Sequence, residues 1–146
     1  MENPRAILPA VAAVIFNAAG EILLQKRKDV NQWGIISGHV EFGETVENAI
    51  LREILEETGL SAEVTRFIGI YSAPASQTYD YPDRTVQYVT SYFEARLTQA
   101  FNPDFCNEET SALQFFSTDA LPENFARVSP HWLSDALSEE ASVFIR

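Results

Sequence analysis

The chain of 146 residues contains a single cysteine, Cys106, and only two histidines, His39 and His131. One cysteine cannot form an internal disulfide, so the sequence predicts no disulfide scaffold and favours a reducing compartment. A catalytic thiol needs a histidine and an orienting group, and no local pattern links either histidine to Cys106. We therefore expect Cys106 to be a packed or idle thiol.

Basic residues are also scarce. Ten Lys and Arg stand against 21 Asp and Glu, which gives a formal net charge of −11. Affinity for nucleic acid and attraction to anionic membranes both rest on clustered basic side chains. The composition therefore predicts a protein that binds neither nucleic acid nor a membrane surface.

Long apolar runs are missing as well. The longest run, residues 6–16, is interrupted by Pro9 and is well short of the roughly 20 residues that a membrane-spanning helix needs. With 46% hydrophobic and 21% charged residues, the chain is typical of one globular domain that buries its own core. We expect a single cytoplasmic domain covering residues 1–146.

Hydrophobic periodicity and turn residues predict strands and helices in mixed order. The expected elements are a hairpin over 8–27, loops over 29–43 and 74–84, strands over 62–72, 85–97 and 113–116, and helices over 45–58, 119–124 and 131–140. Thr45 is the expected N-cap of the first helix, and Gly59 the left-handed residue that ends it. Because regular β-α-β alternation is lacking, this order favours a mixed sheet flanked by helices.

The acidic residues are concentrated in one segment. Six of the 21 lie within residues 38–60, where Arg52 is the one basic residue. The apolar stripe of the predicted helix consists of Val46, Ala49, Ile50 and Ile54. At about 100° per residue, Glu53, Glu56 and Glu57 lie in or beside this stripe rather than opposite it. A solvated acidic face is therefore a poor explanation for these three carboxylates.

Three carboxylates on a partly buried face repel one another and are costly to desolvate without a counter-charge. A divalent cation resolves both problems, and clustered oxygen ligands suit Mg²⁺ or Mn²⁺. Arg52 can pair with Glu56 one turn further on, or reach back to Glu44 ahead of the helix. The glycines around the approach to the helix allow tight turns and the close approach of a ligand; they are Gly34, Gly38 and Gly43.

These residues resemble the Nudix box, G-x5-E-x7-R-E-U-x-E-E-x-G-U, in which U is a bulky aliphatic residue. The match runs from Gly38 to Leu60, and all nine specified positions are filled at the right spacing. The flanks are similar too. A strand pair and Trp33 precede the box, and the run from Phe115 to Pro122 resembles the family's usual sequence, so the resemblance covers most of the chain.

The resemblance implies an α/β fold, an α/β/α sandwich with a mixed β-sheet and the box as a loop-helix-loop metal site. It also implies hydrolysis of a nucleoside diphosphate linked to a further group X, with Mg²⁺ or Mn²⁺ as cofactor. The ligands implied by position in the box are the carbonyl of Gly38 and the carboxylates of Glu53, Glu56 and Glu57. Arg52 and Glu44 would complete the catalytic set by holding the loop and helix together. His39 stands at a variable position and is not expected to be a ligand.

The sequence departs from the family pattern at two places. The Pro-Gly pair that often precedes the box is replaced by Ile36-Ser37. Many relatives carry a late E-x-x-E-L-x-W segment, whereas Ala112 stands here in place of the second acid. If that acid is the general base of those relatives, another carboxylate must serve here. The candidates, which the sequence leaves open, are Glu53, Glu108 and Glu109.

The candidate substrate-binding residues are Arg27, Tyr79, Arg84 and Glu109. Arg27 lies among three consecutive basic residues at a strand end, which favours phosphate contact in an otherwise acidic chain. Arg84 follows the loop 79–83 and is a candidate for contact with a phosphate or ribose. Tyr79, Tyr81 and Trp33 offer aromatic faces for stacking on a base, although packing is the simpler role for Trp33.

We therefore predict a Mg²⁺-dependent pyrophosphohydrolase whose partner is a small nucleotide, either a nucleoside triphosphate or a sugar nucleotide such as ADP-ribose. The alternative is a catalytically silent domain of the same fold that binds or senses nucleotides. The intact set of carboxylates argues against that alternative. A homodimer is one option for the assembly, since members of the resembled family are often dimers.

Overall fold

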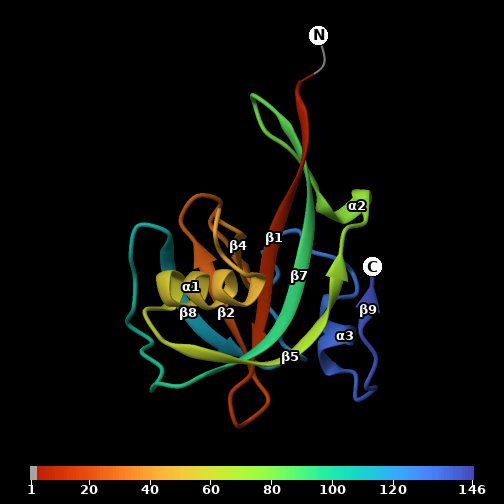
Figure 1. The fold of residues 1–146 in the computed structure, drawn as a ribbon. Coiled ribbons are helices and arrows are strands. Elements are labelled where there is room, and N and C mark those ends of the chain that lie inside the picture. Colours follow the sequence, from red (N-terminus) through yellow and green to blue (C-terminus); the bar gives the residue numbers. More distant parts are fainter. Residues whose placement is uncertain (1–2) are drawn as a thin grey trace.

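The computed structural model describes residues 3–146, and its larger sheet is built on two long strands. β1 (Arg5–Ile15) and β7 (Thr85–Leu97) run parallel along the whole length of β1 (Figure 1). β4 (Ile36–His39) pairs antiparallel with β1, and β5 (Ala62–Tyr71) pairs antiparallel with β7. β9 (Phe144–Ile145) extends the sheet parallel to β5, and β6 (Thr78–Asp80) pairs with the start of β7. The sheet is therefore mixed, as predicted.

A second, antiparallel sheet contains β3 (Gln32–Gly34), β2 (Ile22–Arg27) and β8 (Thr110–Phe116) in that order. The prediction of a hairpin over residues 8–27 is wrong. The turn at 17–20 forms, but a single bridge between Phe16 and Ile22 joins its arms. β1 already has β4 on one side and β7 on the other, so β2 pairs with β3 and β8 instead.

The main helix, α1 (Val46–Thr58), has the predicted ends. The hydroxyl of Thr45 accepts from the backbone N–H of Asn48 at 3.0 Å, and Gly59 adopts a left-handed φ of 73°. Two short helices, α2 (Pro74–Gln77) and α3 (Trp132–Leu137), follow. α3 is shorter than the predicted helix over 131–140, and residues 119–124 form a turn, bends and irregular loop where a helix was expected. The expected loops contain β3 and β4 in 29–43, and α2 and β6 in 74–84.

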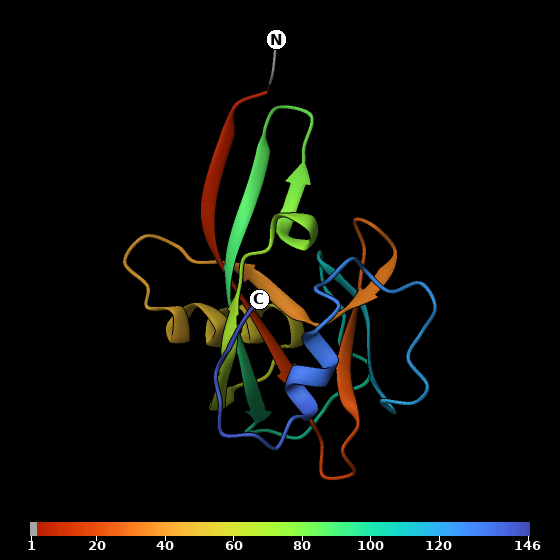
Figure 2. The same ribbon diagram turned by 90° about the vertical axis from the view of Figure 1, so that its right-hand side faces the viewer.

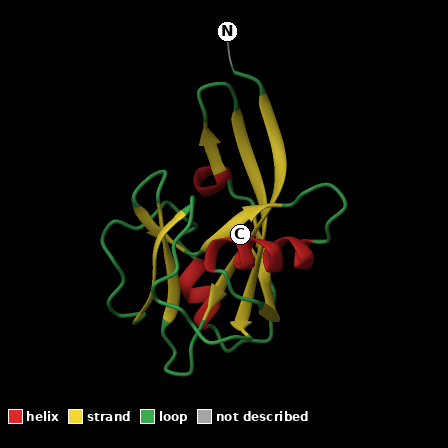
Figure 3. Ribbon diagram, turned by 90° about the vertical axis from the view of Figure 1, so that its left-hand side faces the viewer, coloured by secondary structure: helices red, strands yellow, loops and turns green. Residues whose placement is uncertain are grey.

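Helices cover both faces of the larger sheet (Figures 1 and 3). Alternation along β1 sends Val11, Ala13 and Ile15 into the core under α1, where they pack with Ile50 and Ile54. The intervening Ala12 and Val14 face the opposite core, which α3 closes with Trp132 and Ala136. The predicted α/β/α sandwich with a mixed sheet is confirmed. No helix within residues 3–146 is long and apolar enough to cross a bilayer.

The first halves of β1 and β7 project beyond these two cores, together with β6 (Figure 2). This projection has its own small apolar cluster, in which Ala10, Val86 and Tyr88 are buried and Leu8 and Tyr79 pack against them. The projection carries aromatic side chains toward the same region as the loop that enters α1. A site can therefore form between them.

Candidate active site

A cavity of about 630 Å³ lies beside the C-terminal half of α1 and continues along β7. One part, called the carboxylate part, is lined by Gly38, Arg52, Glu53, Glu56 and Glu57. The other, called the aromatic part, is lined by Tyr79, Tyr81, Tyr88 and Arg127. His39 joins the two parts: its carbonyl oxygen accepts from Arg52, and its ring Nε2 lies 3.2 Å from the Tyr88 hydroxyl.

Arg52 donates hydrogen bonds to three carboxylates and one backbone carbonyl, and it forms a longer ion pair with Glu41 at 3.7 Å. Its Nε and Nη2 donate to the two oxygens of Glu44 at 2.7 and 3.0 Å. Nη1 donates to Glu53 at 2.9 Å and to Glu56 at 3.2 Å, while Nη2 also donates to the carbonyl oxygen of His39 at 2.9 Å. The hydrogen bond from Arg52 lowers the pKa of Glu44 below its ordinary value. Arg52 therefore ties the loop before α1 to two carboxylates of the helix.

Glu57 is the most buried of the three helix carboxylates. The residue is 4% exposed and its Oε2 has no hydrogen-bond partner, whereas the side chains of Glu53 and Glu56 are 12% and 49% exposed. Burial raises the pKa of Glu57 well above its ordinary value, and the neighbouring Glu53 and Glu109 raise it further. Arg27 lowers the pKa of Glu57, but by too little to offset the effects of burial and of the two neighbouring carboxylates. The fold therefore leaves one buried carboxyl group without a positive partner.

Gly38, on β4, makes room for Glu53. A Cβ atom at residue 38 would lie 2.1–2.5 Å from the carboxylate atoms of Glu53, far inside van der Waals contact. The missing side chain lets that carboxylate lie against the backbone of β4. The first glycine of the box thus leaves room for a carboxylate of the box's own helix.

The donor atoms of the carboxylate part fit a hard divalent cation. Carboxylate oxygens are ligands that Mg²⁺ and Mn²⁺ prefer, and Glu57 supplies a buried oxygen that no protein donor satisfies. Within residues 3–146, no three acidic, His or Cys side chains stand ready-made as a metal site. Arg52 holds Glu53 and Glu56 by hydrogen bonds that a cation has to displace or share. The assignment of Gly38, Glu53, Glu56 and Glu57 as ligands stays a prediction.

Gln25 is a cavity residue that the sequence analysis missed. It lies on β2, is 1% exposed and donates from Nε2 to the hydroxyl of Thr110 at 2.7 Å. The Thr110 hydroxyl in turn donates to the carbonyl oxygen of Glu57 at 2.9 Å. A polar residue at a core-facing position of an apolar strand is the sequence pattern that predicts such a role.

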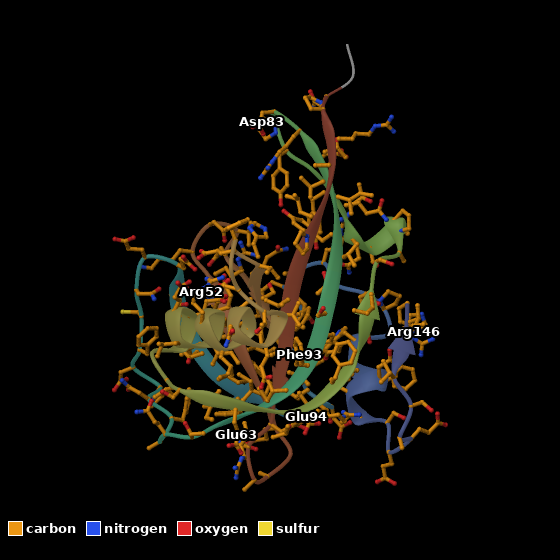
Figure 4. All side chains as sticks on the ribbon, viewed as in Figure 1. Arg52, Glu63, Asp83, Phe93, Glu94 and Arg146 are labelled. Atoms are coloured by element: carbon orange, nitrogen blue, oxygen red, sulfur yellow. The ribbon has the colours of Figure 1, made fainter. Side chains whose placement is uncertain are left out.

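The predicted substrate residues are only partly brought together. Arg27 and Glu109 line the cavity near Glu57, and the guanidinium of Arg27 is paired with Asp29 at 2.6 Å. Arg84 does not line the cavity; it follows the exposed tip between β6 and β7. Figure 4 shows the neighbouring Asp83 at that tip, well away from Arg52 on α1. The Arg84 guanidinium nevertheless lies 5.7 Å from the ring centroid of Tyr81, which lines the aromatic part, so its contact with a substrate stays a prediction.

The aromatic part is organised around Tyr79 and Tyr88. The guanidinium of Arg127 lies 4.2 Å from the centroid of the Tyr79 ring, and the Tyr79 hydroxyl donates to the Arg127 carbonyl at 3.3 Å. Burial raises the pKa of Tyr88 to about 12, and the Tyr81 hydroxyl at 2.8 Å contributes to the increase. Trp33 instead packs edge-to-face on Phe116.

Comparison with known proteins identifies this architecture. The family model described as NUDIX domain matches residues 6–136, which is most of the chain. The chain belongs to the Nudix family. The resemblance noted in the sequence is thereby confirmed, and this Nudix chain carries the complete box on α1 and the loop before it.

The chain is similar to curated proteins that are named for nucleotide substrates. It is 49% identical over 70 residues to an ADP-ribose pyrophosphatase of Methanocaldococcus jannaschii, a match that covers 45% of this chain and 41% of that protein. The chain thus matches less than half the length of the first curated relatives.

Two solved structures share the fold over nearly the whole chain. A UDP-X diphosphatase superimposes with a TM-score of 0.73 and 28% identity, over 92% of this chain and 62% of that one. An ADP-ribose pyrophosphatase from Streptococcus suis superimposes with a TM-score of 0.67 and 25% identity, over 93% and 96% of the two chains.

Proposed function

We propose that this Nudix protein is a divalent-cation-dependent pyrophosphohydrolase that cleaves a nucleoside diphosphate linked to a further group X. The observation that carries the proposal is the single cavity that joins the carboxylate part to the aromatic part. The names of the relatives support it, because the proteins named ADP-ribose pyrophosphatase and UDP-X diphosphatase are both named for nucleotide diphosphates. The proposed partner is a small nucleotide, either a nucleoside triphosphate or a sugar nucleotide such as ADP-ribose.

The two parts of the cavity suit opposite ends of such a nucleotide. Arg52 is occupied by carboxylates, so a bound cation and the nearby Arg27 would be the groups that contact an anion at the carboxylate part, and we place the diphosphate there. The aromatic part offers the Tyr79 ring, with Arg127 stacked on it, for the nucleoside. A volume of about 630 Å³ is within the range of small-molecule sites. Specificity for the base would then depend on residues distant from the box.

The chain's own residues have separable roles in the proposed reaction. Glu53, Glu56 and Glu57 would hold Mg²⁺ or Mn²⁺, with the Gly38 carbonyl as a further ligand. When bound, the cation neutralises the diphosphate and acidifies a water molecule. Arg52 fixes the orientation of the carboxylates through its hydrogen bonds with Glu44 and the carbonyl of His39.

A carboxylate has to accept the proton of the attacking water. Glu108 and Glu109 are exposed at the cavity and free of hydrogen bonds through their carboxylates, within the described residues. Glu53 is committed to Arg52 by a 2.9 Å hydrogen bond. This favours Glu108 or Glu109 as the base, because an exposed carboxylate keeps its lone pairs available.

A nucleotide panel with Mg²⁺ tests the proposal. Nucleoside triphosphates, ADP-ribose and UDP-sugars are incubated with the protein, and the products are identified by ³¹P NMR. We expect cation-dependent cleavage of a phosphoric anhydride in at least one substrate. Nucleotide binding by calorimetry without turnover of any substrate would instead indicate the catalytically silent alternative.

The same assay separates the candidate bases. Glu108→Gln and Glu109→Gln are compared with Glu53→Gln in kcat and in Mn²⁺ affinity. A base variant loses kcat, commonly by 10²–10⁴-fold, and keeps cation affinity. A ligand variant loses both. If neither Glu108→Gln nor Glu109→Gln changes kcat, the base lies elsewhere.

A further inference from the structure

We propose that Gln25 is a positioning residue of the carboxylate part, whose Oε1 accepts a hydrogen bond from the hydrated divalent cation bound by Glu57. This inference rests on the proposed function, because it concerns the same cation. Gln25 lies outside the box, on β2 of the second, three-stranded sheet. It would therefore be a contribution of β2 to the site.

Alternation along β2 brings Gln25 to Glu57. Leu23 packs in the core under α1, while Ile22 and Leu24 pack in the opposite core. Gln25, two residues after Leu23, faces the α1 side, where a long apolar side chain would complete the pattern. The side chain at this position is instead the amide of Gln25, and the residue is 1% exposed.

A chain of hydrogen bonds fixes which end of the amide is left over. The hydroxyl of Thr110 has one hydrogen, and it is donated to the Glu57 carbonyl at 2.9 Å. The hydroxyl must therefore accept from Gln25, and only Nε2 of the amide can donate to it, at 2.7 Å. The amide cannot be flipped without breaking this chain. Oε1 of Gln25 is thus held facing away from Thr110.

That oxygen has no donor. Among residues 3–146, two buried side-chain polar atoms lack a hydrogen-bond partner, Gln25 Oε1 and Glu57 Oε2, and both residues line the same cavity. An unsatisfied buried acceptor destabilises the folded protein. Two such acceptors in one cavity, one of them a carboxylate, match a ligand that brings both positive charge and O–H donors. A hydrated divalent cation has both properties, since Mg²⁺ keeps several of its waters when bound.

The test measures cation binding directly, with Mn²⁺ alone as the probe and the loss of its free EPR signal as the readout. For Gln25→Met, which keeps the volume and removes the acceptor, we expect a 10–100-fold weaker Mn²⁺ affinity, as for other outer-shell partners of metals. The melting temperature of the cation-free variant should stay close to that of the wild type, because removal of the unsatisfied acceptor offsets the loss of the hydrogen bond to Thr110. A merely structural Gln25 would give the reverse: a lower melting temperature and unchanged Mn²⁺ affinity.

Two further variants keep the test decisive if Gln25→Met folds poorly. Gln25→Glu retains an acceptor oxygen at this position and should bind Mn²⁺ at least as tightly as the wild type. Gln114→Met, the same change at an exposed position of the neighbouring strand β8, should alter neither measurement. Weak binding in Gln25→Glu, or wild-type affinity in Gln25→Met, overturns the inference.

Failure of the inference is distinguishable from failure of the proposed function. If the wild type binds Mn²⁺ and hydrolyses no nucleotide, the hydrolase proposal fails while the role of Gln25 is still decided by affinity. If the wild type hydrolyses nucleotides and Gln25→Met keeps its Mn²⁺ affinity, the inference alone fails. If the wild type binds no Mn²⁺, both fail.

Discussion

Two buried carboxyl groups, Glu57 on α1 and Asp135 on α3, show how differently one fold treats the same chemistry. Glu57 is 4% exposed and Asp135 is 2% exposed. Glu57 has an oxygen with no partner and neighbours of its own sign. Asp135 receives hydrogen bonds from Nη2 and Nε of Arg146 at 2.7 and 3.0 Å, and a further one from the Tyr71 hydroxyl.

The two pKa values shift in opposite directions. Burial by itself raises the pKa of Asp135, but the hydrogen bonds from Arg146 and Tyr71 outweigh it, so the pKa lies below its ordinary value. Burial also dominates at Glu57, where no comparable donor offsets it, and the pKa is raised. Figure 4 shows the partner Arg146 near α3, on the side of the molecule away from Arg52.

We infer that the two carboxyl groups have different roles, structural for Asp135 and ligand-binding for Glu57. A buried carboxylate that the fold fully satisfies contributes to a stable native state, and Asp135 joins the C-terminal residue Arg146 to α3 in this way. A buried carboxylate that the fold leaves unsatisfied is unfavourable until a ligand arrives, which is a frequent property of functional sites. Burial alone would not have distinguished the two residues.

Glu57→Gln is expected to have the largest effect on the site. We expect a loss of kcat of about 10²–10³-fold, similar to the loss of one preorganised charge-stabilising group. The cation-free variant should unfold at an equal or higher temperature, because a neutral amide is less costly to bury than a carboxylate. Turnover and calorimetric melting are measured on the same sample. A destabilised variant with full activity would mean that Glu57 is structural.

Asp135→Asn is the matched change at the satisfied carboxyl group. We expect the free energy of unfolding to fall by about 2 kcal/mol, because hydrogen bonds to a charged group are lost in a buried setting. Urea unfolding measures it. The kcat of the folded variant should stay close to that of the wild type. A strong loss of kcat at full stability would show that the two carboxyl groups are not functionally distinct.

Arg52→Lys tests whether the loop before α1 depends on the forked guanidinium. Lysine cannot reproduce the paired hydrogen bonds with Glu44 and the contact with the His39 carbonyl. We expect turnover to fall about 10–100-fold, as for other groups that orient metal ligands. Arg96→Lys, which affects an exposed pair with Glu63, is the control and should leave turnover unchanged.

Gly38→Ala should act on the site more than on the fold. The new Cβ displaces the Glu53 carboxylate, which is the flexible end of a side chain, so stability should change little. Cation affinity, followed by Mn²⁺ titration, should fall about tenfold, in the range for disturbed metal ligation. Gly34→Ala is the control, because its Cβ would meet only Ala126 at an ordinary 3.5 Å. Equal effects of both changes would exclude a specific role for Gly38.

The smallest effect expected is the acid dependence contributed by Asp135. Its folded pKa is lower than its unfolded pKa, so the unfolded state binds more protons near and below the ordinary value of 3.8. The stability that Asp135 contributes is therefore present above about pH 4 and lost as the pH falls through the folded value. Thermal melts across this range should fall less steeply for Asp135→Asn than for the wild type.

Much of the carboxylate part was predictable because its determinants are local. Thr45 and Gly59 set the ends of α1 by capping and backbone conformation, and the helical repeat fixed which acids share a face. The spacing of the glycines and carboxylates in the box indicated the family. The strand over 85–97 was likewise found with its observed bounds.

The sequence predictions failed where tertiary contacts, rather than local sequence, determine the structure of a segment. The predicted turn at 17–20 forms, but its arms pair only at the bridge between Phe16 and Ile22, because β4 and β7 occupy both edges of β1 over residues 10–13. Arg84 does not line the cavity itself, because it lies in the turn between β6 and β7, where its guanidinium is close to the Tyr81 ring. Tyr88 and Arg127 were missed because neither belongs to a motif; the projection and the late loop bring them together with Tyr79.

The family, the helix and the order of its carboxylates follow from residue spacing along a few turns of chain. Which buried carboxyl group has hydrogen-bond partners and which lacks them depends on the tertiary structure. Gln25 and Thr110 are 85 residues apart, Tyr71 and Asp135 are 64 apart, and each pair meets only after the sheets have formed. The desolvation of a group, and the hydrogen-bond partners available to it, depend on everything that packs around it. The spacing of residues along the chain does not encode this packing.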